Sequence, residues 1–412
     1  MAVANGARHP VAVWVLTRTA LLLLVLGVLT YPGPDVTTDV SVIYQGWQEV
    51  LRTGTYPRDD ITWQYPPGAA LVIVAPGLLP GLDYTSAFIV LALLCDLLVL
   101  ALLLRAERHG TRRRGTWTWV AGVPLLGPTV YARYDLMVTA VAVAALLASA
   151  RRPAVMGALA GLGALLKVWP LLVLLGTPRG RVTRRCWAAA AVTAVVPALV
   201  LAAVMPGALA FLTFQRDRGT EVESLGSLVF HVARHFGWQG EVLFNYGSVE
   251  FLGPYVPLVS RLALALSLAA LGWLALWRAR AKEFDAATVC DAAFAAVLLF
   301  TTTSRVISPQ YMVWLVGLAA VCLVHRATAM ARPAMLVLAA TGVTLLEFPV
   351  WFSHVVASDP LGITLLVVRN GLLVAATLDA CLRLWRRTVT AEPGRGRATG
   401  PDARADSPAT SR

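Results

Sequence analysis

The sequence predicts an all-α polytopic membrane protein with about 12 transmembrane helices. Hydrophobic residues make up 58% of the 412 residues and charged residues only 14%, which is more apolar side chain than one globular core can bury. Many apolar runs, such as residues 85–104, reach the roughly 20 residues that cross a bilayer core as a helix. These runs are continuous, whereas the strands of a membrane barrel alternate apolar with polar residues, so helices are favoured.

Clusters of basic residues set the expected topology. They lie at residues 105–114, 151–152, 179–185, 278–282, 325–332 and from 383 to the end. Because cytoplasmic loops carry an excess of Lys and Arg, these clusters predict a multi-pass protein of the cell membrane with both termini in the cytoplasm. The net charge of +12 follows from this topology, and nucleic acid is not expected as a partner. The remaining loops lie outside, the largest at about 32–84 and about 206–254.

Two apolar stretches differ from simple spans between loops, whereas the first apolar run is expected to be an ordinary span. The first run, which ends at Tyr31, lacks a small-residue cleavage site and is expected to stay as the first span. Residues 67–80 connect two external segments, so they predict a short re-entrant or interfacial helix on the outer face. Residues 154–175 have arginines on both flanks, which predicts two short helices that meet near Lys167 and return to the inside. Lys167 then lies at the outer apex, where its charge reaches water or an anion.

Residues 1–385 are expected to form one membrane-embedded domain. The stretch 386–412 is rich in Pro, Gly, Arg, Ala and Ser, which predicts a disordered cytoplasmic tail. The five cysteines are scattered without metal-ligand spacing, and His231 and His235 lack the glutamate of an HExxH motif between them. No metal site and no cofactor are predicted, and dependence on a metal stays open. Asp96, Asp291, Glu347 and Arg369 lie in or near spans and are interpreted as structural pairs.

The first external loop carries the most informative pattern. Asp39 precedes apolar residues that recur at helical spacing, among them Val40, Tyr44 and Trp47. This pattern predicts an amphipathic helix on the outer membrane surface. A carboxylate at its start, beside aromatic rings, can act as a general base toward a sugar hydroxyl. The alternative is that Asp39 only caps the helix, and position alone does not decide between the two.

Several short motifs follow one another in a fixed order along the chain. They are Asp39 with Tyr44, Gly54–Pro57, Tyr65-Pro66-Pro67, Arg133-Tyr134-Asp135, residues 158–170 and Ser308-Pro309-Gln310-Tyr311. Together they cover about residues 14 to 385 and resemble the membrane-embedded GT-C glycosyltransferases, in particular glycosyltransferase family 87. Each motif alone is weak, and their specificity lies in the combination.

The resemblance implies a GT-C-like fold and an outer-face transferase that uses a polyprenyl-phosphate sugar, typically mannose. The acceptor would be a glycolipid or a glycan, in a setting of membrane lipids. The family's acidic base corresponds to Asp39, although Asp35 and Asp59 lie nearby and stay open as alternatives. The residues agree with a lipid-linked donor, because no Gly-rich phosphate loop or Rossmann unit is visible to hold a nucleotide sugar.

Such a reaction requires cations that stabilise the leaving phosphate. The candidates on the expected outer side are Arg133, Lys167, Arg216, Arg218 and Arg305, with Gln310 as a further donor contact. For each cation the alternative is a side chain that snorkels to the interface or ends a helix. The candidates for substrate contacts are Tyr44, Tyr65, Asp135, Glu221, Glu223, His231 and Tyr311. A solvated loop with local ion pairs is the alternative for the dense polar run 215–224.

Two other classes of protein compete with this interpretation. A transporter or lipid-linked-sugar flippase is the main alternative, but no internal repeat is visible and the polar loop in the middle of the chain is external by the basic-residue pattern. A non-catalytic membrane scaffold would leave the acidic first loop and Lys167 unexplained. The sugar, the acceptor, the stereochemical outcome and the oligomeric state do not follow from the sequence.

Overall fold

The computed structural model describes residues 2–108 and 113–390. The helices are α1 (Ala2–Val25), α2 (Gln45–Arg52), α3 (Ala69–Val74), α4 (Tyr84–Ala106), α5 (Arg114–Gly122), α6 (Asp135–Ala148), α7 (Pro153–Leu166), α8 (Arg181–Val204), α9 (Phe211–Asp217), α10 (Leu228–Ala233), α11 (Val256–Arg280), α12 (Ala286–Thr303), α13 (Tyr311–Val324), α14 (Ala331–Leu345), α15 (Phe352–Ala357) and α16 (Pro360–Trp385). Short 3-10 or π-helical segments are η1 (Asp39–Tyr44), η2 (Ala75–Leu78), η3 (Pro124–Ala132), η4 (Trp169–Leu174), η5 (Arg234–Phe236), η6 (Leu346–Val350) and η7 (Arg386–Thr390). The strands are β1 (Thr220–Glu221), β2 (Glu241–Asn245) and β3 (Ser248–Leu252).

The all-α polytopic class is confirmed. Within the described ranges, 7 helices are long and apolar enough to cross a membrane, or 8 if η3 and α6, bent by 109° at their junction, form one span. The expected number of about 12 is not confirmed, because α7, α13 and the α3–η2 pair are shorter apolar helices. Lys167 separates α7 from η4, so the helix break lies where the sequence placed it.

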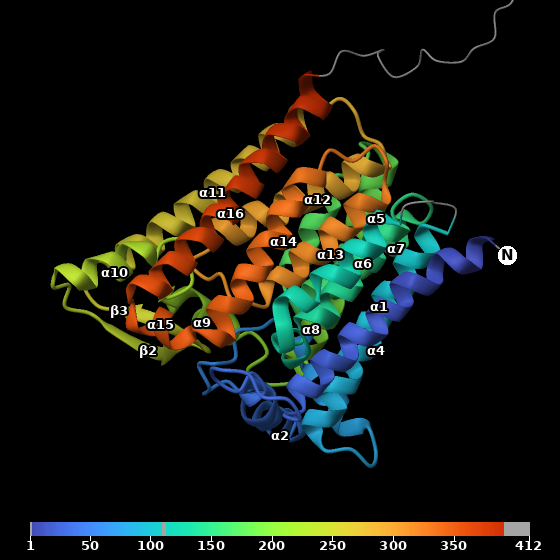
Figure 1. The fold of residues 1–412 in the computed structure, drawn as a ribbon. Coiled ribbons are helices and arrows are strands. Elements are labelled where there is room, and N and C mark those ends of the chain that lie inside the picture. Colours follow the sequence, from blue (N-terminus) through green and yellow to red (C-terminus); the bar gives the residue numbers. More distant parts are fainter. Residues whose placement is uncertain (1, 109–112, 391–412) are drawn as a thin grey trace, which may run out of the picture.

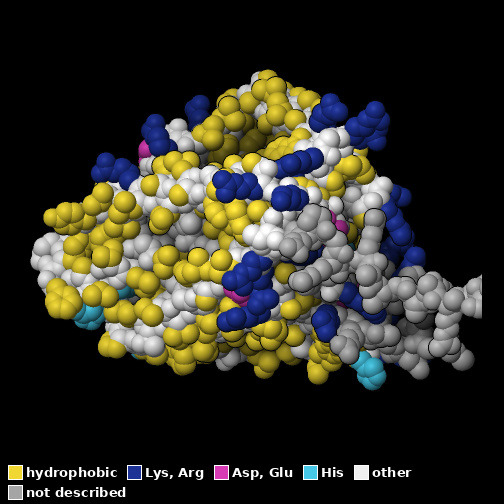
Figure 2. All heavy atoms as spheres, turned by 90° about the horizontal axis from the view of Figure 1, so that it is seen from above, with side chains coloured by type: hydrophobic (Ala, Val, Ile, Leu, Met, Phe, Trp, Pro, Cys, Tyr) yellow, Lys and Arg dark blue, Asp and Glu magenta, His cyan; other side chains and the backbone are white. Residues whose placement is uncertain are grey.

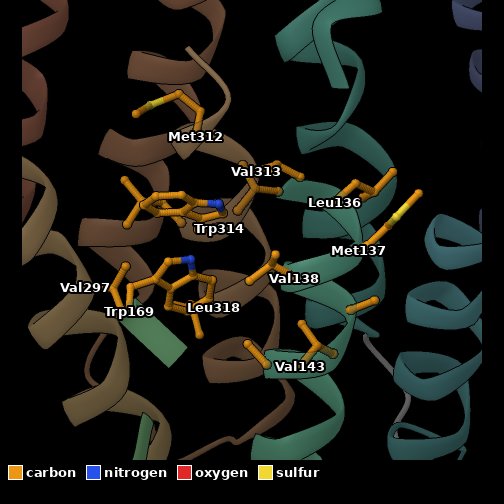
Figure 3. Packing of buried hydrophobic residues seen from close by; sticks show 14 of the residues in the cluster. Leu136, Met137, Val138, Val143, Trp169, Val297, Met312, Val313, Trp314 and Leu318 are labelled. Carbon is orange, nitrogen blue, oxygen red and sulfur yellow. The ribbon is translucent and has the colours of Figure 1, made fainter. Parts of the chain in front are cut away.

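The core lies where α6, α12, α13 and η4 meet. Figure 3 shows Val138 of α6 on the side toward Trp314 and Leu318 of α13, and Trp169 lies beside these two residues. The rings of Trp169 and Trp314 stack with centroids 5.2 Å apart. By contrast, only 6% of the apolar window of α8 is buried in the protein. Bilayer lipid therefore has to cover the outer face of α8.

Charged side chains inside the bundle are paired, as interpreted from the sequence. Asp96 accepts hydrogen bonds from Arg18 Nε at 2.8 Å, Trp119 Nε1 at 2.7 Å and Tyr131 Oη at 2.6 Å. Arg369 forms a two-pronged contact with Glu347, at 2.8 Å from Nε and 2.6 Å from Nη2. Such pairing offsets the cost of holding charge away from water.

The segment between α9 and α11 contains a small sheet that the sequence did not predict. The strand order is β1-β3-β2, and both pairings are antiparallel. Asn245 pairs with Ser248 across a two-residue turn, Tyr246-Gly247, whose φ angles are 49° and 78°. Positive φ at both turn residues defines the type I′ geometry that suits a two-residue hairpin. The sheet and α10 share a second apolar core that includes Val222, Phe230 and Phe251.

The disordered tail was expected from residue 386, but residues 386–390 are helical. η7 continues α16 through residues 386–390, and residues 391–412 lie outside the described part of the chain. Arg387 contacts Asp285 at 2.7 Å and Asp291 at 2.8 Å, and Trp277 Nε1 donates to Thr388 Oγ1 at 2.9 Å. Composition suggested disorder, but these polar partners on other helices fix the segment.

The two ends of the bundle differ in character. Elements α2, α9, α10, α15, β2 and β3 gather at one end, and α1 begins and α16 ends toward the other (Figure 1). Seen from above Figure 1, the molecule shows many Lys and Arg side chains and few Asp or Glu side chains (Figure 2). The candidate site belongs to the end that carries the small sheet.

Candidate active site

A cavity of about 360 Å³ lies at the end of the bundle that carries the small sheet. It is lined by Asp39, Ile43, Tyr44, Trp47, Thr62, Gln64, Tyr65 and Pro66 of the segment between α1 and α3, and by Lys167–Trp169, Phe211, Leu212, Gln215, Arg218, Tyr246, Gly247, Phe300, Ser304–Val306, Ser308, Gln310, Tyr311 and Trp314. The fold thus brings together segments that are far apart in the sequence. Aromatic rings, one carboxylate and several cations share the same space.

Asp39 and Arg133 form an ion pair at the edge of this cavity. Arg133 Nη2 lies 3.0 Å from Asp39 Oδ2, and the Asp39 side chain keeps 30% of its surface exposed. Arg133 Nη1 also donates to the carbonyl oxygens of Val36 at 2.9 Å and Ala132 at 2.7 Å. The guanidinium therefore ties the start of η1 to the junction of η3 and α6, and it holds the carboxylate in place.

The neighbouring Asp35 is engaged differently. Its Oδ1 accepts hydrogen bonds from the backbone N–H and from Oγ1 of Thr37, both at 2.8 Å. Asp35 therefore stabilises the turn that precedes η1, the role that was the alternative for Asp39. Asp35 does not line the cavity, and neither does Asp59, whose side chain is almost fully exposed. Of these three carboxylates, only Asp39 borders the cavity.

Lys167 lies in a box of aromatic rings. Its Nζ is 5.0 to 5.4 Å from the ring centroids of Tyr65, Tyr134, Tyr311 and Trp314. The same Nζ donates to Asp135 Oδ1 at 2.6 Å. Burial lowers the pKa of Lys167, and the charge of Asp135 opposes that shift. The π faces of the four rings and the carboxylate of Asp135 together stabilise the ammonium in this desolvated position.

The run Arg133-Tyr134-Asp135 contacts both the Asp39 carboxylate and the Lys167 ammonium. Arg133 pairs with Asp39, and Asp135 pairs with Lys167 and accepts from Trp314 Nε1 at 2.7 Å. Asp135 Oδ2 is buried without a hydrogen-bond partner. The turn between η3 and α6 therefore fixes the candidate base and the candidate phosphate ligand together.

Arg218 and Arg305 form a cationic wall of the cavity. Arg218 donates to Glu250 Oε1 at 3.0 Å and to Ser248 Oγ at 2.6 Å, so β3 positions it. Arg305 donates to the backbone carbonyls of Gln215 and Arg216. Burial, and next the positive charge of Arg218, lower the pKa of Arg305. Two guanidinium groups so close to each other favour an anion between them.

Glu221 and Glu223 do not line the cavity, and each contacts residues next to it or deeper in the protein. Glu221 accepts from the backbone N–H of Ile307 and from Ser308 Oγ, both at 2.6 Å, so it shapes the turn that places Gln310 and Tyr311. Glu223 Oε1 lies 3.8 Å from Arg369 Nη2. Burial, followed by the charges of Glu347 and Glu221, raises the pKa of Glu223 well above its ordinary value. Burial and these two negative charges therefore favour the protonated form of Glu223.

The structure separates the predicted site residues into three groups. Asp39, Tyr44, Tyr65, Lys167, Arg218, Arg305, Gln310 and Tyr311 line the cavity. Arg133 and Asp135 contact lining residues directly. Arg216, Glu221, Glu223 and His231 are outside the lining. Glu221 contacts the lining residue Ser308, and the direct substrate contacts expected of Glu221 and Glu223 stay a prediction.

Two of the outlying residues have other neighbours. The Arg216 side chain is 74% exposed, pairs with Asp217 at 2.7 Å and lines a second cleft next to the cavity. His231 is buried, and its Nδ1 and Nε2 lie 2.8 Å from Ser358 Oγ and the Val222 carbonyl. Burial lowers the pKa of His231 to about 4. His231 therefore holds the second apolar core together, because its neutral ring satisfies both neighbours there.

Several lining residues were not predicted. They include Trp47, Gln64, Trp169, Gln215, Tyr246 and Trp314. The sequence around Tyr246 carries no strong hairpin signal, because Tyr-Gly is not one of the Asn-Gly, Asp-Gly or Gly-Gly pairs that typically form a two-residue turn. In residues 2–108 and 113–390, no group of three His, Cys, Asp or Glu side chains is arranged to hold a metal ion.

The fold and the cavity define a polytopic membrane protein with a site at one end of its helical bundle, built from a carboxylate, cations and aromatic rings. Residues 63–309, more than half of the chain, match the model of glycosyltransferase family 87, and the chain belongs to that family. The resemblance noted in the sequence is confirmed, and the chain is a glycosyltransferase. No curated protein and no solved structure matches it. Nothing in these findings supports the transporter alternative.

Proposed function

We propose that this protein transfers mannose from a polyprenyl-phosphate donor to a glycolipid or glycan acceptor on the outer face of the plasma membrane. One observation carries the proposal: a partly accessible carboxylate, Asp39, and the cations Lys167, Arg218 and Arg305 line one cavity. A transfer from a lipid phosphate needs a base for the acceptor and positive charge for the leaving group.

In the proposed reaction the acceptor hydroxyl oxygen attacks the anomeric carbon of the donor sugar. The bond from that carbon to the phosphate oxygen breaks, and its electron pair stays with the polyprenyl phosphate. The hydroxyl proton passes to the carboxylate of Asp39. A single displacement of this kind inverts the configuration at the anomeric carbon. Lys167, Arg218 and Arg305 stabilise the charge on the departing phosphate.

Arg133 acts as a positioning residue in this scheme. Its ion pair with Asp39 at 3.0 Å and its bonds to the carbonyls of Val36 and Ala132 hold the base at the cavity edge. Asp135 has the matching role for Lys167. Because both contacts come from one short turn, a shift of this turn moves base and cation together.

A lipid-linked donor is supported by a second cleft of about 430 Å³ next to the cavity. Arg218 and Arg305 line both spaces. The cleft extends to the first turns of α11, where Leu262 and Leu264 expose apolar side chains. A phosphate at the two arginines then lies close to a surface that suits a polyprenyl chain. The basic opposite end of the bundle supports an orientation with this site outside.

The proposal is tested with membranes from cells that overexpress the protein and from cells that carry the empty vector. Polyprenyl-phosphate-[14C]mannose and GDP-[14C]mannose are supplied separately, with synthesis of the lipid donor blocked. Labelled glycan or glycolipid formed only from the lipid donor, and only in the overexpressing membranes, is the expected result. Equal labelling in the two membrane preparations would contradict the proposed function.

A further inference from the structure

A third space, a cleft of about 810 Å³, opens beside the active-site cavity. One wall is a face of η1 and α2 that includes Ile43, Gly46 and Trp47. The other walls are the loop of residues 55–62 and the side chain of Phe244 on β2. The cleft therefore lies between the first external loop and the hairpin of the large external loop.

This cleft shares a wall with the cavity that holds the proposed base. Ile43, Trp47 and Thr62 line both the cavity and the cleft. Asp39 begins the helical segment that carries Ile43 and continues into Trp47. An acceptor whose hydroxyl meets Asp39 can therefore extend along the same helix into the cleft.

The charges in the cleft differ from those beside the cationic wall. The cleft on the donor side is lined by Arg216, Arg218, Arg261 and Arg305, with one carboxylate, Asp217. The 810 Å³ cleft has the carboxylates of Asp59 and Asp60 and a single cation, Arg58, which pairs with Asp59 at 3.4 Å. The two clefts share no lining residue. A phosphate group is favoured in the first cleft and disfavoured in the second.

The polar and aromatic groups of the cleft suit a sugar. Asp60 is held in place because it accepts from Trp47 Nε1 at 2.9 Å and from Thr62 Oγ1 at 2.6 Å. The Phe244 ring is 60% exposed, so one face is free to stack on a pyranose ring. Carboxylate oxygens accept hydrogen bonds from sugar hydroxyls, and aromatic rings cover the apolar face of the sugar.

We infer that this cleft binds the sugars of the acceptor that precede the residue to be glycosylated. The acceptor of the reaction is therefore an uncharged oligosaccharide chain of two or more sugars. This inference rests on the proposed function, since it assigns the acceptor of the same site. The inference adds Phe244 as a specificity determinant. Phe244 does not line the active-site cavity and has no role in the proposed reaction.

The test compares the binding of two neutral glycosides to the purified, detergent-solubilised full-length protein. Octyl α-mannoside and octyl α-mannotrioside are titrated into the wild type, Phe244→Ala and Leu243→Ala by calorimetry. Leu243 is the matched control, because it is the preceding residue of β2, is 49% exposed and does not line the cleft. The mannotrioside is expected to bind the wild type at least about tenfold more tightly than the monomannoside. Phe244→Ala should lose about threefold to tenfold of that affinity, and Leu243→Ala should not.

Equal affinities of the wild type for the two glycosides would overturn the inference. Equal behaviour of Phe244→Ala and Leu243→Ala would do the same. A parallel titration with undecaprenyl phosphate tests a lipid occupant: weaker binding of this lipid by Phe244→Ala, with unchanged mannotrioside binding, also overturns the inference. The binding assay needs no donor. Selective mannotrioside binding without any sugar transfer would thus support the cleft and contradict only the proposed function.

Discussion

Arg133 Nη2 lies 3.0 Å from Asp39 Oδ2 and joins two segments that are far apart in the chain. Asp39 starts η1 in the first external loop, and Arg133 occupies the bend between η3 and α6. The guanidinium also anchors the carbonyl of Val36, so it fixes the backbone before η1 as well as the carboxylate. The position of the proposed base therefore depends on a side chain from another part of the fold.

Replacement of Arg133 should test whether this residue positions the carboxylate of Asp39. Arg133→Met removes the ion pair and the two carbonyl contacts, so we expect kcat to fall by about 100-fold as the base loses its orientation. Arg133→Lys keeps the charge and one contact and should recover part of kcat. Transfer rates at saturating donor and acceptor check this. Equal kcat for the wild type and Arg133→Met would show that the ion pair does not position the base.

Lys167→Met should both destabilise the protein and weaken donor use. The substitution leaves the buried carboxylate of Asp135 without its cation, which costs about 3–5 kcal/mol in comparable sites. The double variant Lys167→Met/Asp135→Asn removes both charges and should regain most of the thermal stability. Its KM for the polyprenyl-phosphate donor should stay raised by about tenfold, because the ammonium is still missing.

Thermal unfolding and donor titration of these two variants are the measurements. A double variant with normal donor KM would mean that Lys167 serves stability alone. A double variant as unstable as Lys167→Met would show that the buried charge of Asp135 is not the cause of the instability.

Glu221→Gln should lower activity through the turn it holds. The carboxylate accepts from the N–H of Ile307 and from Ser308 Oγ, and an amide can accept only one of these hydrogen bonds well. We expect kcat/KM to fall by about tenfold, with the donor and acceptor affected alike because Gln310 and Tyr311 shift together. Glu283→Gln, an exposed glutamate far along the chain, is the matched control and should behave as the wild type.

His231 predicts a dependence of stability on acid pH. Its pKa is lowered to about 4 in the folded protein, below the ordinary value of 6.5, because burial disfavours the charged ring. The unfolded chain therefore binds the proton first. The contribution of His231 is complete above about pH 6.5, and roughly 3 kcal/mol is lost as the pH falls from there to about 4.

The measurement is thermal unfolding of the wild type and His231→Gln between pH 7.5 and pH 4.5. The glutamine amide of this variant keeps an N–H donor for the Val222 carbonyl but does not titrate. The wild type should lose more stability than the variant over this range. Parallel curves for the two proteins would contradict a buried neutral His231.

The sequence predicted the features that depend on local pattern. Hydropathy predicted the all-α membrane class, although not the number of spans, and flanking arginines placed the break between α7 and η4 at Lys167. The short runs around Asp39, Arg133 and Lys167 were selected as site residues, and the structure brings these three segments together. Each of these signals lies within a few residues of the feature that it predicts.

Features that depend on distant partners were not predicted. The strands β1–β3 are two to five residues long, so their hydrophobic alternation is too short to detect in a polar loop. His231 and Arg216 carry the same chemistry as the residues that line the cavity. Only the tertiary structure shows that His231 supports a core and that Arg216 lines the neighbouring cleft instead. The segment 386–390 is polar in sequence but helical, because Arg387 pairs with two aspartates. Asp291 lies on α12, and Asp285 directly precedes that helix.

The most direct test of the central claim is sugar transfer by purified wild type and Asp39→Asn, with Asp35→Asn as the matched control. The substrates are polyprenyl-phosphate-[14C]mannose and octyl α-mannotrioside. Asp39→Asn keeps the size of the side chain, so it should fold as the wild type by thermal unfolding while its transfer rate falls by about 100-fold or more. Asp35→Asn should keep the wild-type rate, because Asp35 faces Thr37 and not the cavity. Normal transfer by Asp39→Asn would contradict the assignment of Asp39 as the base.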